Sequence, residues 1–201
     1  MLVLLLVLTL ASSPLDQLAA KLQAAPAWQA GFSQSFVPAG LSRGSQEHGT
    51  FTFAHPSRVR FDYQGDPKRT FAVDGSLARM VDAEAGTCQA LELSQGAWAS
   101  LPLVTLTDPG ALRGFFTVEE KAEAITLLPR QPSPELARVV VHLGPDGLPQ
   151  EVLVEDGSGN LNLFRFSRWR AQKTVPRELF SPSLPGQPPC LPGGDNPRPQ
   201  R

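Results

Sequence analysis

Short runs in which apolar and polar residues alternate fill most of the chain from residue 32 onward, and this pattern limits the folds available to it. Phe51 and Phe53 are flanked by threonines, and residues 59–63 alternate apolar with charged side chains. A period of two is typical of strands that bury one face and expose the other. Turn sequences such as those at residues 74–75 and 156–160 separate the runs at short intervals. The pattern predicts one large, meandering antiparallel sheet.

The same signals place further strands along the chain. Within residues 161–166 the apolar positions change phase after residue 163, which predicts either a bulge or a strand buried on both faces. The expected strands cover residues 32–36, 50–53, 59–63, 71–73, 78–81, 125–128, 138–142, 151–155, 161–167 and 169–173.

Two segments carry helix signals instead. Before the sheet, Ser13 is a good N-cap and Pro14 is favoured at the first helical position. The apolar residues that follow recur at the spacing of one helix face. Between the strands, Asp108 and Pro109 open a second expected helix within residues 102–116. The apolar face of the first helix consists of Leu15, Leu18, Ala19 and Leu22.

Length and charge exclude several classes of protein. A chain of 201 residues with 41% hydrophobic residues is long enough for one domain with a sizeable core. Its 18 Lys and Arg residues are balanced by 19 Asp and Glu residues, and no basic run occurs. Because nucleic-acid binding requires a clustered excess of positive charge, we expect no nucleic-acid partner.

The amino terminus has the pattern of a secretory signal. An apolar run at residues 2–10 is followed by the small residues Ala11, Ser12 and Ser13. The run is too short for a membrane span, which needs about 20 residues, but it suits the apolar part of a signal peptide. We therefore assign residues 1–13 to a signal peptide and expect the mature chain outside the cytoplasm. A buried amino-terminal strand or helix is the alternative.

No group of residues predicts an enzyme. A nucleophilic hydrolase would present its serine on a G-x-S-x-G turn, and the chain has no such motif. Gly157-Ser158-Gly159 is the nearest match, but it lies where a hairpin turn is expected. His48 and His55 fall on opposite faces of a regular strand, which argues against a metal site. We expect no catalytic residue, no metal and no cofactor.

The carboxy-terminal residues are rich in proline, so residues 186–201 are expected to form a disordered tail. The chain has two cysteines, Cys88 and Cys190, and an oxidising compartment would permit them to pair. Because Cys190 lies in the tail, we expect free thiols or a loose, dispensable bridge.

The aromatic side chains expected on the sheet exceed what one short helix can cover. Either the sheet closes on itself, or it encloses a space that something apolar must fill. An ordinary filled core is the alternative, because alternating aromatic residues usually form one.

Several short segments occur in an order and spacing that resemble the periplasmic lipoprotein carrier family, LolA. The resemblance extends from about residue 15 to residue 185. The segments are FSQSF at residues 32–36, GTFTFAHPSRVRFDY at 49–63, the Asp74-Gly75 turn, LLP at 127–129, the hairpin at 155–160, FSRW at 166–169 and VPRELF at 175–180.

The resemblance implies a mainly β domain at residues 14–185, an unclosed and strongly curved antiparallel half-barrel covered by a helical lid. The space between sheet and lid would hold the acyl chains of lipoproteins that cross the periplasm from the inner to the outer membrane. The implied partners are acylated lipoproteins, an ABC-type lipoprotein-releasing complex in the inner membrane and an outer-membrane receptor. We expect a monomer that performs no covalent chemistry.

By position, the resemblance also implies which residues line the cavity and which form the lid. The expected cavity wall consists of Phe51, Phe53, Val59, Phe61, Tyr63, Phe71 and Val73. The expected lid consists of Leu15, Leu18, Leu22, Leu103, Leu106, Leu112 and Phe115.

The sequence departs from the family pattern at two positions. His55 precedes Pro56 where the family usually has an arginine that fastens the lid helices by hydrogen bonds. We expect His55 to be a weaker, pH-dependent latch, because neutral imidazole donates one hydrogen bond and guanidinium donates several. The alternative is a solvent-exposed His55 without a role. Arg79 replaces the usual aromatic residue after the Asp74-Gly75 turn, which puts that part of the wall in question.

Two other functions compete with a carrier. One is a non-transporting envelope module that senses lipid or a lipoprotein tail. Such modules usually have an extra domain, for which this chain offers no room. The other is an envelope hydrolase, which the missing catalytic residues disfavour.

Overall fold

The computed structural model describes residues 12–93 and 109–193, and the structural statements that follow concern these residues. Helix α1 (Pro14–Gln23) comes first, α4 (Pro109–Phe115) lies between the two groups of strands, and the short 3-10 helix η1 (Arg177–Phe180) follows the last strand. The first group of strands is β1 (Ala27–Val37), β2 (Ser45–Ala54), β3 (Arg58–Tyr63), β4 (Arg69–Asp74), β5 (Leu77–Asp82) and β6 (Thr87–Glu92). The second group is β7 (Phe116–Lys121), β8 (Ala124–Pro129), β9 (Arg138–Leu143), β10 (Pro149–Glu155) and β11 (Leu161–Gln172).

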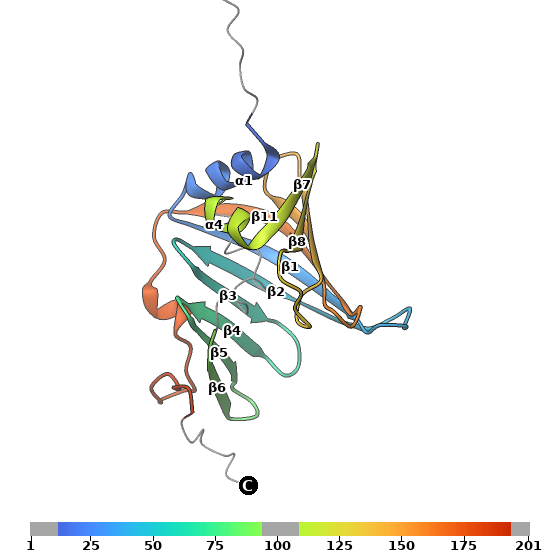
Figure 1. Cartoon of the computed structure of the whole chain (residues 1–201). Coiled ribbons are helices and arrows are strands. Elements are labelled where there is room, and N and C mark those ends of the chain that lie inside the picture. The colour runs from blue at the N-terminus through green and yellow to red at the C-terminus, as the bar shows by residue number, and fades with distance from the viewer. Residues whose placement is uncertain (1–11, 94–108, 194–201) are drawn as a thin grey trace, which may run out of the picture.

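All of these strands form one antiparallel sheet in the order β6-β5-β4-β3-β2-β1-β11-β10-β9-β8-β7. Each group of strands is a meander, and the long pairing of β1 with β11 joins the two groups. Among the described residues, β6 and β7 have no further strand beside them, so the sheet is not closed. It curves strongly, and its concave face turns toward the helices (Figure 1). The predicted half-barrel with a helical lid is confirmed.

Helix α1 forms where the sequence predicts it. The Ser13 hydroxyl accepts a hydrogen bond from the backbone N–H of Asp16 at 3.3 Å, which satisfies one of the free amides at the helix start. Leu15, Leu18 and Leu22 lie on one helix face and are fully buried against the sheet. Burial of each leucine contributes about 2 kcal/mol. Of the helices in residues 12–93 and 109–193, none combines the length and the apolar composition that a membrane crossing requires.

Apolar residues occupy both faces of the first half of β11, which agrees with the interpretation of residues 161–166 as a strand that is buried on both faces. Leu163 is half-buried on the convex face, and Phe166 is buried on the concave face. A bulge is also present, but it lies beyond the segment where the sequence predicts one. The register with β1 shifts between Ser167 and Arg170, and Arg168 takes the extra position with a φ of 56°.

The carboxy-terminal segment does not leave the domain as a free tail. Cys88 of β6 and Cys190 form a disulfide, so the expectation of free thiols is wrong, whereas the alternative of a dispensable bridge stays a prediction. Leu184 packs against Val81 and Cys88 and is buried. Leu184 and Cys190 are therefore held against the convex face of the sheet, and the disorder expected beyond Pro185 stays a prediction for the rest of the tail.

Gly49 of β2 has no side chain, which allows the backbone of β3 and the ring of Phe32 to lie close to it. A Cβ atom at Gly49 would overlap the carbonyl oxygen of Asp62 and lie 2.9 Å from Cε1 of Phe32. Because a paired backbone cannot move aside as a side chain can, Gly49→Ala is expected to lower the free energy of unfolding by about 3 kcal/mol. Urea unfolding followed by circular dichroism measures this loss.

Gly114 provides the matched control, because a Cβ atom there would meet no atom from elsewhere in the described residues within 4 Å. Gly114→Ala is expected to leave the unfolding midpoint unchanged or to raise it slightly, since alanine favours a helix over glycine. Equal midpoints for the two alanine variants would contradict the close approach at Gly49.

Candidate functional site

The seven residues predicted for the cavity wall lie on one face of the sheet, the concave face. Residues that pair across neighbouring strands share a face. Tyr63 lies two residues beyond Phe61 on β3 and therefore faces the same side. The other wall residues form two registered rows, Phe53, Val59 and Val73 in one and Phe51, Phe61 and Phe71 in the next.

Phe61 is the centre of an aromatic cluster on this face. Its ring centroid lies 4.8 Å from that of Phe51, 5.2 Å from that of Phe32 and 5.6 Å from that of Phe164. The ring of Phe32 stands nearly perpendicular to that of Phe61, an arrangement that places a ring edge against a ring face. Phe164 comes from β11, so the cluster joins β3 to a strand of the other half of the sheet.

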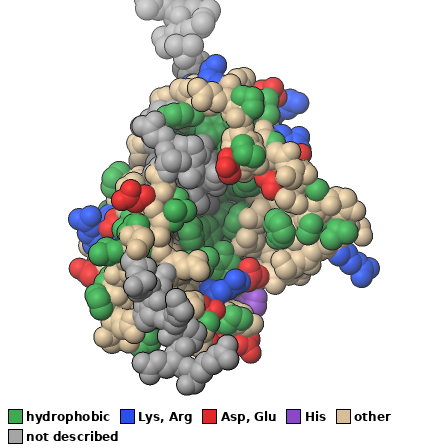
Figure 2. All heavy atoms as spheres, turned by 60° about the horizontal axis from the view of Figure 1, so that its bottom comes forward, with side chains coloured by type: hydrophobic (Ala, Val, Ile, Leu, Met, Phe, Trp, Pro, Cys, Tyr) green, Lys and Arg blue, Asp and Glu red, His purple; other side chains and the backbone are tan. Residues whose placement is uncertain are grey.

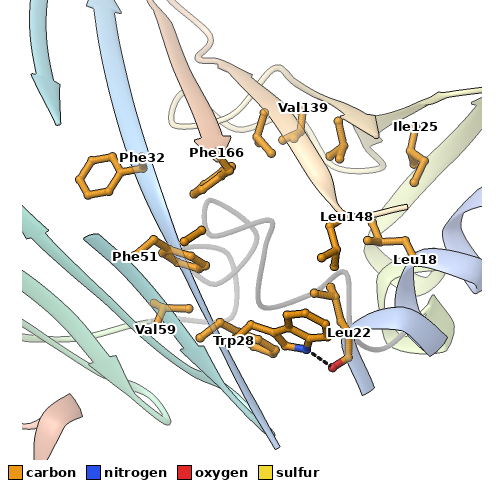
Figure 3. Close-up of a cluster of buried hydrophobic side chains, with 14 of the residues drawn as sticks. Leu18, Leu22, Trp28, Phe32, Phe51, Val59, Ile125, Val139, Leu148 and Phe166 are labelled. Carbon is orange, nitrogen blue, oxygen red and sulfur yellow. Dashed lines mark hydrogen bonds between the residues drawn. The ribbon is translucent and has the colours of Figure 1, made fainter. Parts of the chain in front are cut away.

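The second half of the sheet supplies a further apolar surface that the sequence-based list of wall residues omits. In Figure 3, Val139 and Ile125 from this half and Phe51 and Val59 from the other half are directed toward a common interior. The alternation in residues 124–129 and 138–143 is the signal for these positions, but it does not tell which distant strands they will face. The buried side chains of this half include Ile125, Leu127, Val139, Val141, Val152 and Phe166.

Figure 2 shows a hollow on one face of the molecule, and the side chains visible inside it are hydrophobic. The buried apolar residues of both half-sheets and of α1 belong to one continuous cluster. Within residues 12–93 and 109–193, no group of three or more His, Cys, Asp and Glu side chains lies close enough to hold a metal ion. The chemistry that this surface offers is the exclusion of water from an apolar ligand.

Four of the five described residues predicted for the lid are buried, and one is exposed. Leu112 of α4 is fully buried, as are the three leucines of α1. Phe115 is 50% exposed, whereas the next residue, Phe116, is buried as the first residue of β7. The helix ends at Phe115, so the strand that follows turns Phe116, and not Phe115, toward the core. Leu103 and Leu106 lie outside the described residues.

Polar contacts fix the two helices to each other. The Arg113 guanidinium of α4 contacts Oδ1 of Asp16 in α1 at 3.2 Å and Oε1 of Glu120 in β7 at 3.5 Å. The hydrogen bond from Arg113, with a second from Ser13, holds the pKa of Asp16 below its usual value. Arg113 and Asp16 are exposed and Glu120 is half-buried, so water screens much of their attraction and the buried leucines dominate the packing of the lid.

His55 contacts the lid helix at its carboxy-terminal end. Its Nε2 lies 3.0 Å from the carbonyl oxygen of Leu22, and its ring packs against Phe53 with centroids 4.8 Å apart. The same carbonyl accepts a hydrogen bond of 2.7 Å from the indole N–H of Trp28 (Figure 3). His55 is therefore half-buried and contacts the lid, whereas its role as a latch stays a prediction.

His55→Ala is expected to lower the free energy for opening α1 from the sheet by about 1 kcal/mol, because it removes one of the two contacts described at the Leu22 carbonyl. Hydrogen exchange measured by mass spectrometry should show faster exchange in the peptide that covers α1. His48→Ala is the control, because His48 is exposed on the convex side of β2, the strand that ends just before His55. His55→Arg should slow the exchange, since guanidinium offers more donors. Equal exchange in wild type and His55→Ala would rule out the latch.

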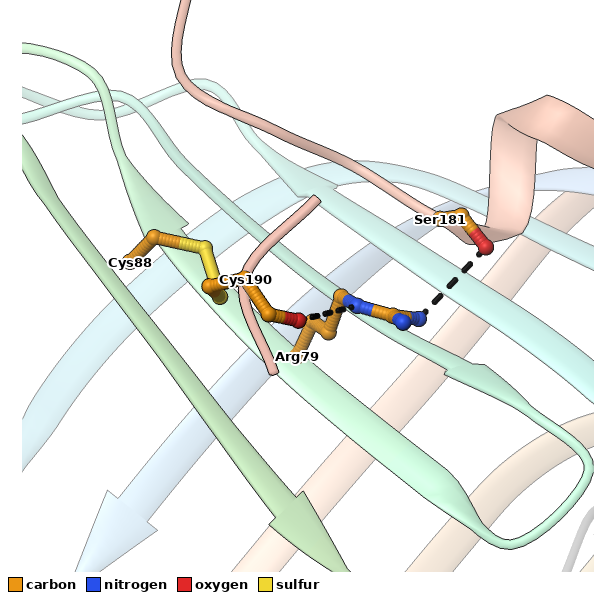
Figure 4. Close-up of a disulfide and its surroundings, with 4 residues drawn as sticks. All are labelled: Arg79, Cys88, Ser181 and Cys190. Carbon is orange, nitrogen blue, oxygen red and sulfur yellow. Dashed lines mark hydrogen bonds between the residues drawn. A yellow bond between two sulfur atoms is a disulfide. The ribbon is translucent and has the colours of Figure 1, made fainter. Parts of the chain in front are cut away.

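Arg79 does not interrupt the concave wall. It pairs with Ala72 of β4, and the residues before and after it, Ala78 and Met80, pair with wall residues. Arg79 therefore points to the convex face, where its Nε donates to the carbonyl oxygen of Cys190 at 3.0 Å (Figure 4). The doubt that the sequence raised about this part of the wall is removed, because the face of a strand residue follows from its register.

Tyr63 marks the polar limit of the aromatic surface. Its hydroxyl donates a 2.9 Å hydrogen bond to Oε1 of Gln34, and its ring packs against Phe32 at 5.3 Å between centroids. Burial, followed by the nearby Glu47 carboxylate, raises the pKa of Tyr63 to about 12. The phenol thus keeps its proton and remains a donor to Gln34 at neutral pH.

The chain has one tyrosine, so phenolate absorbance reports on Tyr63 alone. In the folded protein this absorbance should appear around pH 12, whereas the urea-unfolded control should titrate near the ordinary pKa of about 10. The free energy of unfolding should be unaffected below pH ~10 and should fall between pH ~10 and ~12, because Tyr63 releases its phenol proton more readily in the unfolded state. A folded protein whose phenolate appears near 10 would contradict the burial of Tyr63.

Comparisons with known proteins agree with this geometry. The family model described as outer membrane lipoprotein carrier protein LolA matches residues 23–183. An outer-membrane lipoprotein carrier protein of Methylococcus capsulatus is 26% identical over 179 residues, which covers 87% of this chain and 85% of that protein. The crystal structure of an uncharacterized conserved protein from Thermus thermophilus aligns with a TM-score of 0.52 and 9% identity over 86% of this chain and 93% of that chain. This last similarity is one of fold alone.

Proposed function

Because the chain belongs to the outer membrane lipoprotein carrier family, we propose that it binds acylated lipoproteins and carries them through the periplasm from the inner to the outer membrane. The observation that supports this proposal most is the continuous apolar face that both half-sheets and α1 turn toward one interior. The sheet is open at both edges in the described residues, so its two halves can separate further than those of a closed barrel.

In this proposal the acyl chains lie against the concave wall, with the predicted residues from Phe51 to Val73 on one side and α1 on the other. Each methylene group removed from water contributes about 0.8 kcal/mol, so acyl chains gain several kcal/mol from a dry apolar surface. The carrier needs no covalent chemistry. Binding and release depend on how readily α1 and α4 move from the sheet.

The finer steps follow from this role. An ABC-type releasing complex in the inner membrane would deliver the lipoprotein, and an outer-membrane receptor would accept it. The Leu22 carbonyl, held by Trp28 and His55, is the contact at which either partner could influence the lid.

Native mass spectrometry of the protein purified from its own periplasm tests the proposal. The expected result is a complex with an acylated polypeptide, which dissociates to the mass of the carrier and of a lipoprotein. A free lipid without polypeptide, or no bound apolar molecule at all, would overturn the carrier role. Bound lipoprotein that is never passed to acceptor vesicles with outer-membrane extract would instead favour a sensing module.

A further inference from the structure

The apolar concave face ends in a row of polar side chains on five neighbouring strands. Gln34 lies two residues beyond Phe32 on β1 and therefore shares the concave face with it. Gln34 pairs with Glu47 of β2, and Tyr63 of β3 pairs with Arg69 of β4. Asn162 extends the row onto β11 through its hydrogen bond to Gln34. These residues are Asn162, Gln34, Glu47, Tyr63 and Arg69, and all are half-buried.

The row is connected by hydrogen bonds that run in one direction. The Tyr63 hydroxyl donates to Oε1 of Gln34, and Nε2 of Gln34 donates to Oδ1 of Asn162, each at 2.9 Å. At the other end, the Arg69 guanidinium forms an ion pair with Glu47 and lies 5.5 Å from the centre of the Tyr63 ring. These contacts use the acceptor oxygens of Gln34 and Asn162.

What remains in the row is a surplus of donors. The amide nitrogen of Asn162 and the second proton on Nε2 of Gln34 have no acceptor among the described residues. Nε of Arg69 is buried and has no hydrogen-bond partner there. Of these donors, Nε of Arg69 is the buried one, and a buried donor without an acceptor is costly. The Glu47 carboxylate is already engaged by Arg69. The row is therefore suited to a ligand group that only accepts hydrogen bonds.

We propose that this polar row binds the acceptor oxygens of the ligand's head, ester or amide carbonyls or a phosphoryl group, while the acyl chains extend from it over Phe61 toward the lid. This proposal rests on the proposed function, because the chains must lie on the apolar wall. The protonated Tyr63 hydroxyl keeps Gln34 oriented with its amide nitrogen toward Asn162. A cationic head would meet Arg69 and the free amide donors, so the row discriminates against it.

Two probes that differ in one carbonyl group test the row. Monopalmitoylglycerol contains an ester carbonyl, and its ether analogue hexadecylglycerol does not. Each is titrated against a bound fluorescent fatty-acid probe. The wild type should bind the ester about 10-fold more tightly than the ether, which corresponds to one or two satisfied hydrogen bonds.

Asn162→Asp is the decisive variant, because it keeps the side-chain shape and replaces two donors by an acceptor. It should reduce the ester-to-ether ratio to about 1 while the ether binds as in wild type. Gln34→Leu should also lower the ester-to-ether ratio, because leucine donates no hydrogen bond. Gln29→Leu is the matched control, since Gln29 lies on the opposite face of the same strand and should leave the ratio unchanged.

A third probe distinguishes a carbonyl from a phosphoryl group. Palmitoyl lysophosphatidic acid should bind more tightly than monopalmitoylglycerol only if the row accepts phosphate, and Arg69→Gln and added salt should then abolish that gain. An ester-to-ether ratio of 1 in the wild type, with both glycerolipids bound and no tighter binding of lysophosphatidic acid, overturns the polar row alone. Failure of both glycerolipids to displace the fatty-acid probe overturns the proposed function and the row with it.

Discussion

Phe61→Glu is expected to weaken the binding of a fluorescent fatty-acid probe about 100-fold while the sheet remains folded, because a carboxylate on the apolar wall must be desolvated or protonated when an acyl chain covers it. Phe61 is 6% exposed and contacts the rings of Phe32, Phe51 and Phe164, so the substitution places the charge at the centre of the concave surface. Far-ultraviolet circular dichroism should retain the β signal, with a lowered midpoint of thermal unfolding.

Two companion variants separate binding from folding. Phe61→Leu keeps the wall apolar and should bind the probe nearly as well as the wild type. Gln46→Glu adds the same charge on the convex side of β2, where Gln46 is exposed, and should leave binding unchanged. Global unfolding of Phe61→Glu would indicate a filled core instead of a cavity wall. A folded Phe61→Glu protein with unaltered affinity would remove Phe61 from the binding surface.

Removal of the disulfide is expected to give the largest loss of stability. Cys88 and Cys190 are 102 residues apart, so the bridge closes a long loop and strongly restricts the unfolded chain. The double variant Cys88→Ala and Cys190→Ala should therefore lose about 4 kcal/mol in the free energy of unfolding. Urea unfolding of the oxidised wild type and of the variant measures this difference.

The same variant should also release the carboxy-terminal segment from the sheet. Limited proteolysis is expected to cleave within residues 182–189 in the variant sooner than in the wild type, because Leu184 and the Arg79 contacts alone then hold the segment. Arg79→Lys, with the disulfide intact, is the control and should remain resistant. A stability loss below about 1 kcal/mol would identify the bridge as dispensable, as the sequence suggested.

The local features of the fold follow from the sequence because neighbouring residues determine them. Ser13 and Pro14 fix the start of α1, and the spacing of its leucines fixes the buried side. The alternation around Phe51 and Phe61 assigns these side chains to one face of their strands, and the pairing of β2 with β3 then places them side by side. The half-barrel itself came from a resemblance carried by several short segments, and the sheet order confirms it.

The tertiary structure decided what depends on residues far apart in the chain. A strand pattern does not reveal its distant partner, so it does not predict the wall contributed by Ile125 and Val139. Among the described strands, the pairing of β1 with β11 joins the two halves of the sheet. The Cys88–Cys190 bridge depends on where residues 181–193 cross the sheet, which their proline content does not encode. Arg79 was placed on the wall because its register with Ala72 was unknown. In each case the missing information is the geometry of pairing between distant segments, which only the folded sheet provides.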